Sequence, residues 1–182
     1  MSKTKQKICD AALKLFNRDG LKNVRLQHIA DEAFVSVGNL AYHYKNKEAI
    51  LEVLYERVTQ KQRELLAEYR IVPLFDNLEK LFAGTFHLQQ AYIFFYLDTL
   101  EIIRTYPQIG TAHREHIQSK VSQMELMLDF NSARGALLPE PSEGTYKQLA
   151  HLLWMNMDFW HLQHTITEES PAIEGNYSES IW

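Results

Sequence analysis

The chain has 182 residues, of which 46% are hydrophobic and 23% are charged, as expected for a soluble globular protein with a sizeable core. Its single cysteine, Cys9, excludes an internal disulfide and a cysteine-based metal site, which fits the reducing cytoplasm. No run of about 18 apolar residues exists, and no apolar stretch follows the N-terminal lysines, so we expect neither a membrane span nor a signal peptide.

The net charge of −4 is divided unevenly along the chain. Residues 1–60 carry ten Lys or Arg and seven Asp or Glu, a net charge of +3, whereas residues 61–182 carry nine and sixteen, a net charge of −7. A basic head on an acidic body is typical of a protein that presents only its head to DNA. An excess of three charges also arises by chance, so this signal counts only together with a motif.

The first predicted helix spans residues 3–18, and Gly20 is its expected C-terminal cap. Three lysines at its start either touch phosphate groups or form a solvated tail. The apolar residues of this helix recur at helical spacing and form its expected buried stripe. This stripe consists of Ile8, Ala12, Leu15 and Phe16.

Two short helices joined by a tight turn follow, at Leu26 to about Ala33 and Val37 to about Tyr44. Ser36 is placed to cap the second of them with its hydroxyl, and Asn46 to cap a third helix that starts near Lys47. Two helices with a turn of about three or four residues form a helix-turn-helix, whose second helix enters the DNA major groove.

The head carries one continuous motif, which reads Ile8-x-x-Ala11-Ala12-x-x-Leu15-Phe16, Gly20, Ile29-Ala30 and Val35-Ser36-x-Gly38-Asn39-Leu40-x-Tyr42-His43-Tyr44-x-Asn46-Lys47-Glu48. With this motif, about residues 4–54 resemble the DNA-binding domain of the TetR/AcrR family of bacterial transcriptional regulators. This resemblance implies an all-helical protein that dimerises through its C-terminal domain, and in most members represses transcription until a small ligand binds there. We therefore expect a three-helix DNA-binding domain in residues 1–47 and a helical regulatory and dimerisation domain in residues 48–182.

Three positions depart from the family pattern. Arg25 stands where the family usually has a capping Thr, so we expect Asn23 to replace that cap. Phe34 occupies the turn position of a Gly and is unfavourable there if φ is positive. Ala41 replaces a common Tyr, which removes a large groove contact but leaves a methyl for a thymine.

Matched positions in the motif imply the residues that contact double-stranded DNA. Those expected to face base edges are Gln27, Val37, Gly38, Asn39 and Ala41. Those expected to hold phosphate groups are Tyr42, His43 and Lys47, with Lys45 and Arg25 as possible additions.

The body is predicted to be helical throughout. A long helix from Lys47 to about Tyr69 links it to the head, and helices at about 73–88 and 109–134 follow, the latter ended by Gly135. Residues 91–106 are apolar nearly all round, which favours one buried central helix over a buried strand. A last helix spans about 143–167, with Ser142 as its cap.

The resemblance implies that the last two helices form the four-helix bundle of a homodimer, and their broad apolar faces agree with this; the alternative is an ordinary monomer core. Aromatic residues of the body predict an apolar effector cavity with polar anchors, although an aromatic stripe is more often plain core. The predicted effector residues are Phe82, Phe86, His87, Tyr92, Phe95, Tyr96, Asp98, Trp154 and Asp158.

Two other classes of function remain. The pairs His113-x-x-His116 and His161-x-x-His164 each place two imidazoles on one helical face, where a metal could bind. Because no further metal ligands accompany them, we favour surface histidines over a metal site. We expect no enzyme activity, cofactor or metal. The changes at Arg25, Phe34 and Ala41 keep open a DNA-inactive helical dimer that acts as a small-molecule-binding or protein-interaction module.

The apolar end at Trp182 predicts a cut chain or a tail that packs on the partner.

Overall fold

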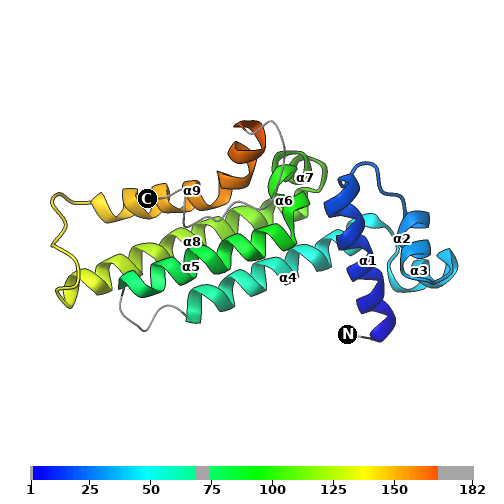
Figure 1. Ribbon diagram of the computed structural model, residues 1–182, viewed down its shortest axis with the longest axis horizontal. Helices are drawn as coiled ribbons and strands as arrows, with labels where there is room; N and C mark the ends of the chain where they lie inside the picture. Colours follow the sequence, from blue (N-terminus) through cyan, green and yellow to red (C-terminus); the bar gives the residue numbers. More distant parts are fainter. Residues whose placement is uncertain (1, 69–73, 168–182) are drawn as a thin grey trace.

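A computed structural model of the chain describes residues 2–68 and 74–167, and the predicted C-terminal tail lies outside these ranges. Within them every regular element is an α-helix, which confirms the all-α prediction. The first three helices form a head at one end of an elongated body of long, roughly parallel helices (Figure 1). The helices are α1 (Lys3–Asp19), α2 (Leu26–Glu32), α3 (Val37–His43), α4 (Lys47–Glu68), α5 (Leu74–Ala91), α6 (Ile93–Leu97), α7 (Thr99–Thr105), α8 (Pro107–Ala133) and α9 (Thr145–Thr167).

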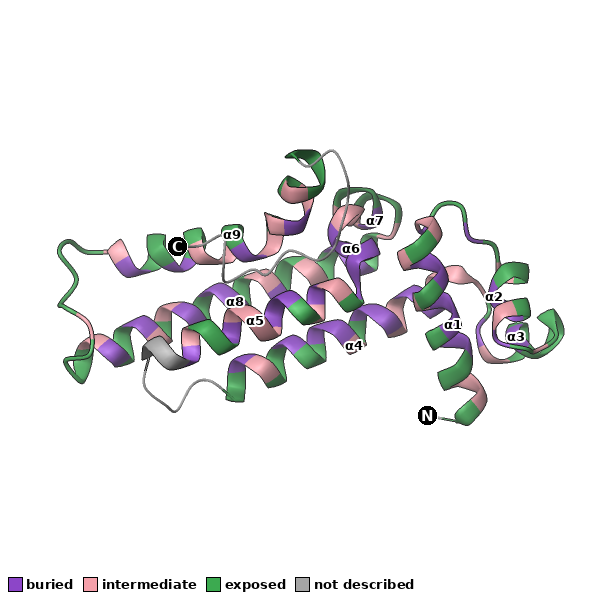
Figure 2. Ribbon diagram, viewed as in Figure 1, coloured by how far each residue is buried: buried purple, intermediate pink, exposed green. Residues whose placement is uncertain are grey.

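The head is held by the stripe predicted for α1. Ile8, Ala12 and Phe16 are completely buried and Leu15 nearly so, and they pack in one apolar cluster with residues of α2, α3 and α4 (Figure 2). Each fully buried Ile, Leu or Phe contributes about 1.5–3 kcal/mol by leaving water. This cluster continues into α6 and α7, so head and body share a core, and the division at residue 47 remains a prediction.

Gly20 ends α1 as predicted, with its N–H bonded to the Phe16 carbonyl at 3.0 Å, and of the three predicted N-terminal caps in the head two are confirmed and one is wrong. The Ser36 hydroxyl accepts the Asn39 N–H at 3.1 Å, and Asn46 Oδ1 accepts the Ala49 N–H at 2.9 Å. Asn23 does not cap α2, because its amide donates to the Asp19 carbonyl at 2.8 Å and closes the turn after α1. At the start of α2, the Arg25 N–H instead donates to His28 Nδ1 at 3.3 Å.

Phe34 holds a left-handed backbone in the turn between α2 and α3, with φ of 55°. The Val35 N–H donates to the Ala30 carbonyl at 3.0 Å, a helix-ending pattern that normally places glycine at the position of Phe34. The Phe34 side chain is 93% exposed and thus gains little packing in return.

Replacing Phe34 with glycine is expected to raise the free energy of unfolding by about 1 kcal/mol, because glycine removes the steric cost of positive φ. Urea unfolding of the two proteins at equal concentration measures this difference. A loss of stability instead would show that the Phe34 ring packs against the head.

The single helix predicted for residues 91–106 is wrong, because the chain breaks at Tyr92 and again at Asp98. Partners from the head explain both breaks. At the first, the Asn17 amide donates to the Ala91 carbonyl at 3.0 Å and accepts the Phe94 N–H at 3.3 Å. At the second, the Asp98 carboxylate bonds to the backbone of Leu21.

The last two helices begin and end close to their predicted bounds. Gly135, with φ of 77°, follows α8 as expected. The N-terminal turn of α9 differs from its prediction, because the Glu140 carboxylate accepts the Tyr146 N–H at 2.6 Å, whereas the Ser142 hydroxyl lies 3.0 Å from Thr145 Oγ1. The acidic side chain supplies both a hydrogen-bond acceptor and a favourable charge at a helix N-terminus.

Candidate DNA-binding face and regulatory core

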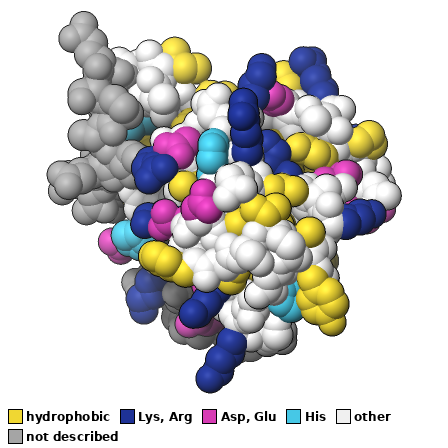
Figure 3. Space-filling model, turned by 90° about the vertical axis from the view of Figure 1, so that its right-hand side faces the viewer, with side chains coloured by type: hydrophobic (Ala, Val, Ile, Leu, Met, Phe, Trp, Pro, Cys, Tyr) yellow, Lys and Arg dark blue, Asp and Glu magenta, His cyan; other side chains and the backbone are white. Residues whose placement is uncertain are grey.

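One face of α3 is open to solvent at the far end of the head. Leu40 is fully buried and anchors the helix, while its other face turns outward. Lys and Arg side chains surround this end of the molecule, with apolar groups exposed among them (Figure 3). The exposed residues of α3 are the predicted Val37, Gly38, Asn39, Ala41 and Tyr42, the last of them 85% exposed.

Two further predicted contacts lie at the start of α2. Arg25 and Gln27 are both exposed. In the free protein Gln27 Nε2 donates to Asp31 Oδ1 at 2.7 Å. This bond must break before the Gln27 amide can form hydrogen bonds to an adenine. The long side chain of Arg25 carries its charge at the surface of the head, where a phosphate group could approach it.

The predicted phosphate-binding residues differ in how far they are exposed. Lys45 is exposed, and the half-buried His43 ring meets Tyr42 edge to face at 5.1 Å. Lys47 Nζ instead donates to the carbonyls of Leu21 and Val24 at 2.8 and 3.0 Å, and burial lowers the pKa of Lys47. Lys47 thus ties the start of α4 to the loop after α1, and a phosphate contact from it stays a prediction.

Replacing Gly38 with alanine is expected to separate stability from DNA affinity. A Cβ at Gly38 would meet nothing nearer than Ser36 Oγ at 4.0 Å, so alanine fits and should stabilise α3 by about 0.5 kcal/mol. If the Gly38 backbone approaches the bases, the methyl should weaken DNA binding about tenfold. Thermal unfolding and gel-shift titration measure the two effects.

Gly110 offers the opposite control, because a Cβ there would lie 2.8 Å from the Ile103 carbonyl oxygen. G110A should therefore lower stability. Unchanged DNA affinity in G38A would rule out close approach of the DNA at this position.

Asn17 is a linking residue that the sequence analysis missed. Its amide bonds to both sides of the break between α5 and α6, and the nearby rings of Phe16 and Phe94 lie 5.3 Å apart. Together these contacts fix the C-terminal half of α1 to the body. An asparagine near the end of an amphipathic helix gives no sequence signal for this role.

The predicted effector residues are divided between several parts of the body. Tyr92, Phe95 and Tyr96 are buried in the cluster that joins head and body, Phe82 packs on a second cluster farther along the body, and His87 is exposed. Asp98 faces the head, and burial raises the pKa of its carboxyl group. Phe86 stacks on His161 at 4.8 Å. The effector role of these residues stays a prediction.

Trp154 and Asp158 are brought together in a buried polar group between α8 and α9. Asp158 accepts from Lys120 Nζ at 2.5 Å and from Trp154 Nε1 at 2.7 Å. The side chain of Lys120 is 2% exposed and that of Asp158 12%. Such a pair is sustained only by near-ideal geometry, because both charges lose their hydration.

The prediction of surface histidines is wrong for one member of each pair. His116 and His161 are buried, and burial lowers the pKa of each to about 4. His116 bonds to Gln62 at 2.6 Å, and the stacking of His161 on Phe86 compensates part of its burial. Within residues 2–68 and 74–167, no three His, Cys, Asp or Glu side chains gather as a metal site would require.

An apolar seam runs along the outer side of α9 and the end of α8. On α9 its members recur with spacings of three, four and seven, as in helices that pair along a narrow stripe. The seam consists of Leu126 and Phe130 of α8 and Leu152, Met155, Phe159 and Ile166 of α9, all exposed.

No helix in the described part of the chain is both long and apolar enough to cross a membrane.

The sequence matches known families of bacterial regulatory proteins. Residues 8–54 match the family of bacterial regulatory proteins named tetR, and residues 53–181 match a family described as bacterial transcriptional repressor, TetR. Over 67 residues the chain is 34% identical to the HTH-type transcriptional regulator AcrR of Shigella flexneri. That match covers 37% of this chain and 31% of the AcrR relative, under a third of its length.

Solved structures share the fold over nearly the whole chain. A TetR-family regulator from Marinobacter aquaeolei has a TM-score of 0.84 at 23% identity, over 92% of this chain and 82% of its own. PfmR from Thermus thermophilus has a TM-score of 0.74 at 16% identity, over 95% and 91%. The chain therefore belongs to the TetR family of bacterial transcription regulators, which are DNA-binding transcription factors rather than enzymes.

Proposed function

We propose that this protein is a cytoplasmic repressor that binds a palindromic operator as a homodimer and is released from it by a small apolar or aromatic effector. The observation that carries the proposal is the exposed face of α3, which is anchored by Leu40 and presents Asn39, Ala41 and Tyr42 to solvent. A short helix with a buried back and an open front is what entry into a major groove requires.

The apolar seam supports a dimer through α8 and α9. Exposed Leu152, Met155 and Phe159 lie on one stripe, and pairing two such stripes across a twofold axis would bury them. A dimer presents two copies of α3, and two half-sites about 34 Å apart then bind together. The second contact adds affinity because it becomes intramolecular.

The contacts of the head with the body support control by an effector. Asn17 bonds to both sides of the α5–α6 break, so a shift of these helices would move α1 and the attached α3. An effector acts only by its differential affinity for the two positions of the heads. The aromatic residues predicted from the sequence remain candidates to contact it.

Selection from a randomised pool of duplex DNA at two salt concentrations tests the proposal. We expect enrichment of a palindrome and an affinity that falls steeply with salt. Asn39, exposed on α3, and Asn156, exposed on α9, provide a matched pair of substitutions. N39A should weaken binding to the selected site about tenfold, whereas N156A should not.

Failure of the wild-type protein to enrich any sequence at low salt would overturn the repressor proposal. The protein would then be better described as a DNA-inactive dimer that binds a small molecule or another protein. Such a result would direct attention to the body, whose polar interior and seam do not depend on DNA.

A further inference from the structure

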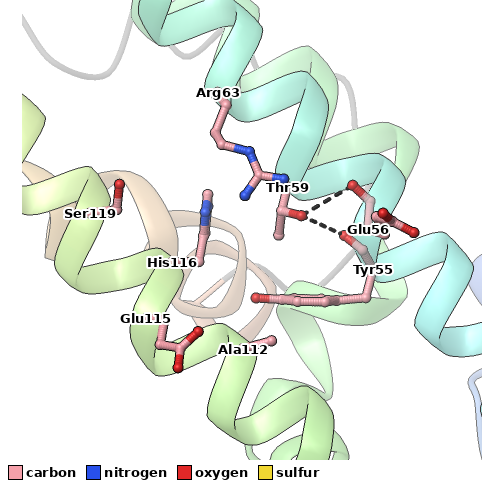
Figure 4. A pocket seen from close by; sticks show the side chains of 8 residues that line it. All are labelled: Tyr55, Glu56, Thr59, Arg63, Ala112, Glu115, His116 and Ser119. Atoms are coloured by element: carbon pink, nitrogen blue, oxygen red, sulfur yellow. Dashed lines mark hydrogen bonds between the residues drawn. The ribbon is translucent and has the colours of Figure 1, made fainter.

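A pocket of about 390 Å³ opens between α4 and α8 in the body (Figure 4). Tyr55, Thr59 and Arg63 line it from α4, and His116 and Ser119 line it from α8. None of the effector residues predicted from the sequence lines this pocket. It lies along the helix that leads directly out of the DNA-binding head.

The hydrogen bonds of His116 define the position of its ring proton. Gln62 Nε2 donates to the Tyr96 hydroxyl at 2.5 Å, so the Gln62 carbonyl oxygen is the atom turned to His116. His116 Nε2 lies 2.6 Å from that oxygen and must therefore carry a proton to donate. A neutral imidazole with its proton on Nε2 has a lone pair on Nδ1.

His116 Nδ1 is an unused acceptor in a buried place. The residue is 8% exposed, and its Nδ1 is closed off from solvent and has no hydrogen-bond partner. Burial, reinforced by the positive charge of Lys120, lowers the pKa of His116 to about 4, so the ring is neutral at neutral pH. A buried acceptor without a donor is unfavourable, and a donor brought by a ligand relieves that deficit once the side chains that close Nδ1 off from solvent move aside to admit it.

The charges around the pocket favour the same kind of ligand. Glu56 and Glu115 line it with one cation, Arg63, and the nearby Lys120 is already paired with Asp158. A carboxylate would bring only acceptors to Nδ1 and would face two like charges. A ligand with an O–H or N–H group meets both the acceptor and the excess of negative charge.

We propose that the pocket between α4 and α8 binds a small ring-bearing molecule through an O–H or N–H donor that bonds to His116 Nδ1. The Tyr55 ring supplies an apolar wall for the ring of the ligand. The regulatory meaning of this site rests on the proposed function, because a ligand wedged between α4 and α8 would act on the DNA-binding head through α4.

Four probes of similar size test the chemistry of the site: phenol, benzylamine, anisole and benzoate. Phenol and benzylamine carry donors and should bind at millimolar concentrations in calorimetric titration. Anisole and benzoate lack a donor and should bind at least about tenfold more weakly. Comparing phenol with benzylamine tells whether a neutral donor or a cationic one is preferred.

A pair of substitutions locates the binding. H116Q keeps an amide that can donate to Gln62 but removes the Nδ1 acceptor, and it should weaken phenol binding about tenfold while leaving the thermal unfolding midpoint nearly unchanged. H151Q changes an exposed histidine on α9 and should bind phenol like the wild type. Long-range proton–nitrogen correlation spectra should show the Nε2–H tautomer of His116.

Several results would overturn the site. These are equal affinity for all four probes, no binding of any probe, an Nδ1–H tautomer, or full phenol affinity in H116Q. DNA binding is measured separately by gel shift. Phenol binding without an effect on DNA affinity would uphold the site and reject its regulatory role, whereas a protein that never binds DNA would reject the proposed function alone.

Discussion

Replacing Asp158 with alanine is expected to lower the free energy of unfolding by about 3–5 kcal/mol, because Lys120 would remain buried without its partner. The Lys120 side chain is 2% exposed, and its ammonium group lies 2.5 Å from the Asp158 carboxylate. The Trp154 N–H would lose its acceptor as well. Chemical denaturation at a fixed protein concentration measures the change, since dimerisation also contributes to stability.

Two controls distinguish a buried charge from a general loss of contacts. The double variant K120M/D158A removes the stranded cation and should recover most of the lost stability. The surface pair of Lys14 and Glu32, whose side chains are 64% and 28% exposed, should behave differently. E32A is expected to change stability by less than about 1 kcal/mol. Equal losses in D158A and E32A would contradict the buried-charge argument.

Replacing Leu152 with glutamate is expected to convert the dimer to a monomer and to weaken operator binding about 100-fold. Leu152 is 61% exposed and belongs to the apolar seam on α9, where a charge would be trapped between the two copies. Sedimentation and gel-shift titration against the selected palindrome measure the two effects.

Leu100 provides the matched control for this substitution. It is 56% exposed on α7, outside the seam. L100E should therefore remain dimeric and bind DNA like the wild type. A dimeric L152E would show that the two copies meet through another surface, and a monomeric L152E with full DNA affinity would show that pairing of the heads does not need a dimer.

The helix-turn-helix could be read from the sequence because its signals are local. Ser36 and Asn46 cap their own helices from three residues away, and Leu40 lies at the spacing that buries it. The exposed face of α3 follows directly from that register. Even the positive φ at Phe34 follows from the family pattern, because the turn geometry requires it whatever residue occupies it.

Contacts between distant segments decided the rest. The apolar run at residues 91–106 reads as one helix, yet Asn17, 74 residues before Ala91, supplies partners that stabilise a break there. His116 reads as a surface residue, since only its pairing with Gln62, 54 residues away, permits burial of a polar ring. Helical periodicity and caps were thus determined by the sequence alone, whereas the buried polar network and the pocket between α4 and α8 were decided by tertiary structure, because hydrogen-bond partners far apart in the chain leave no periodic pattern.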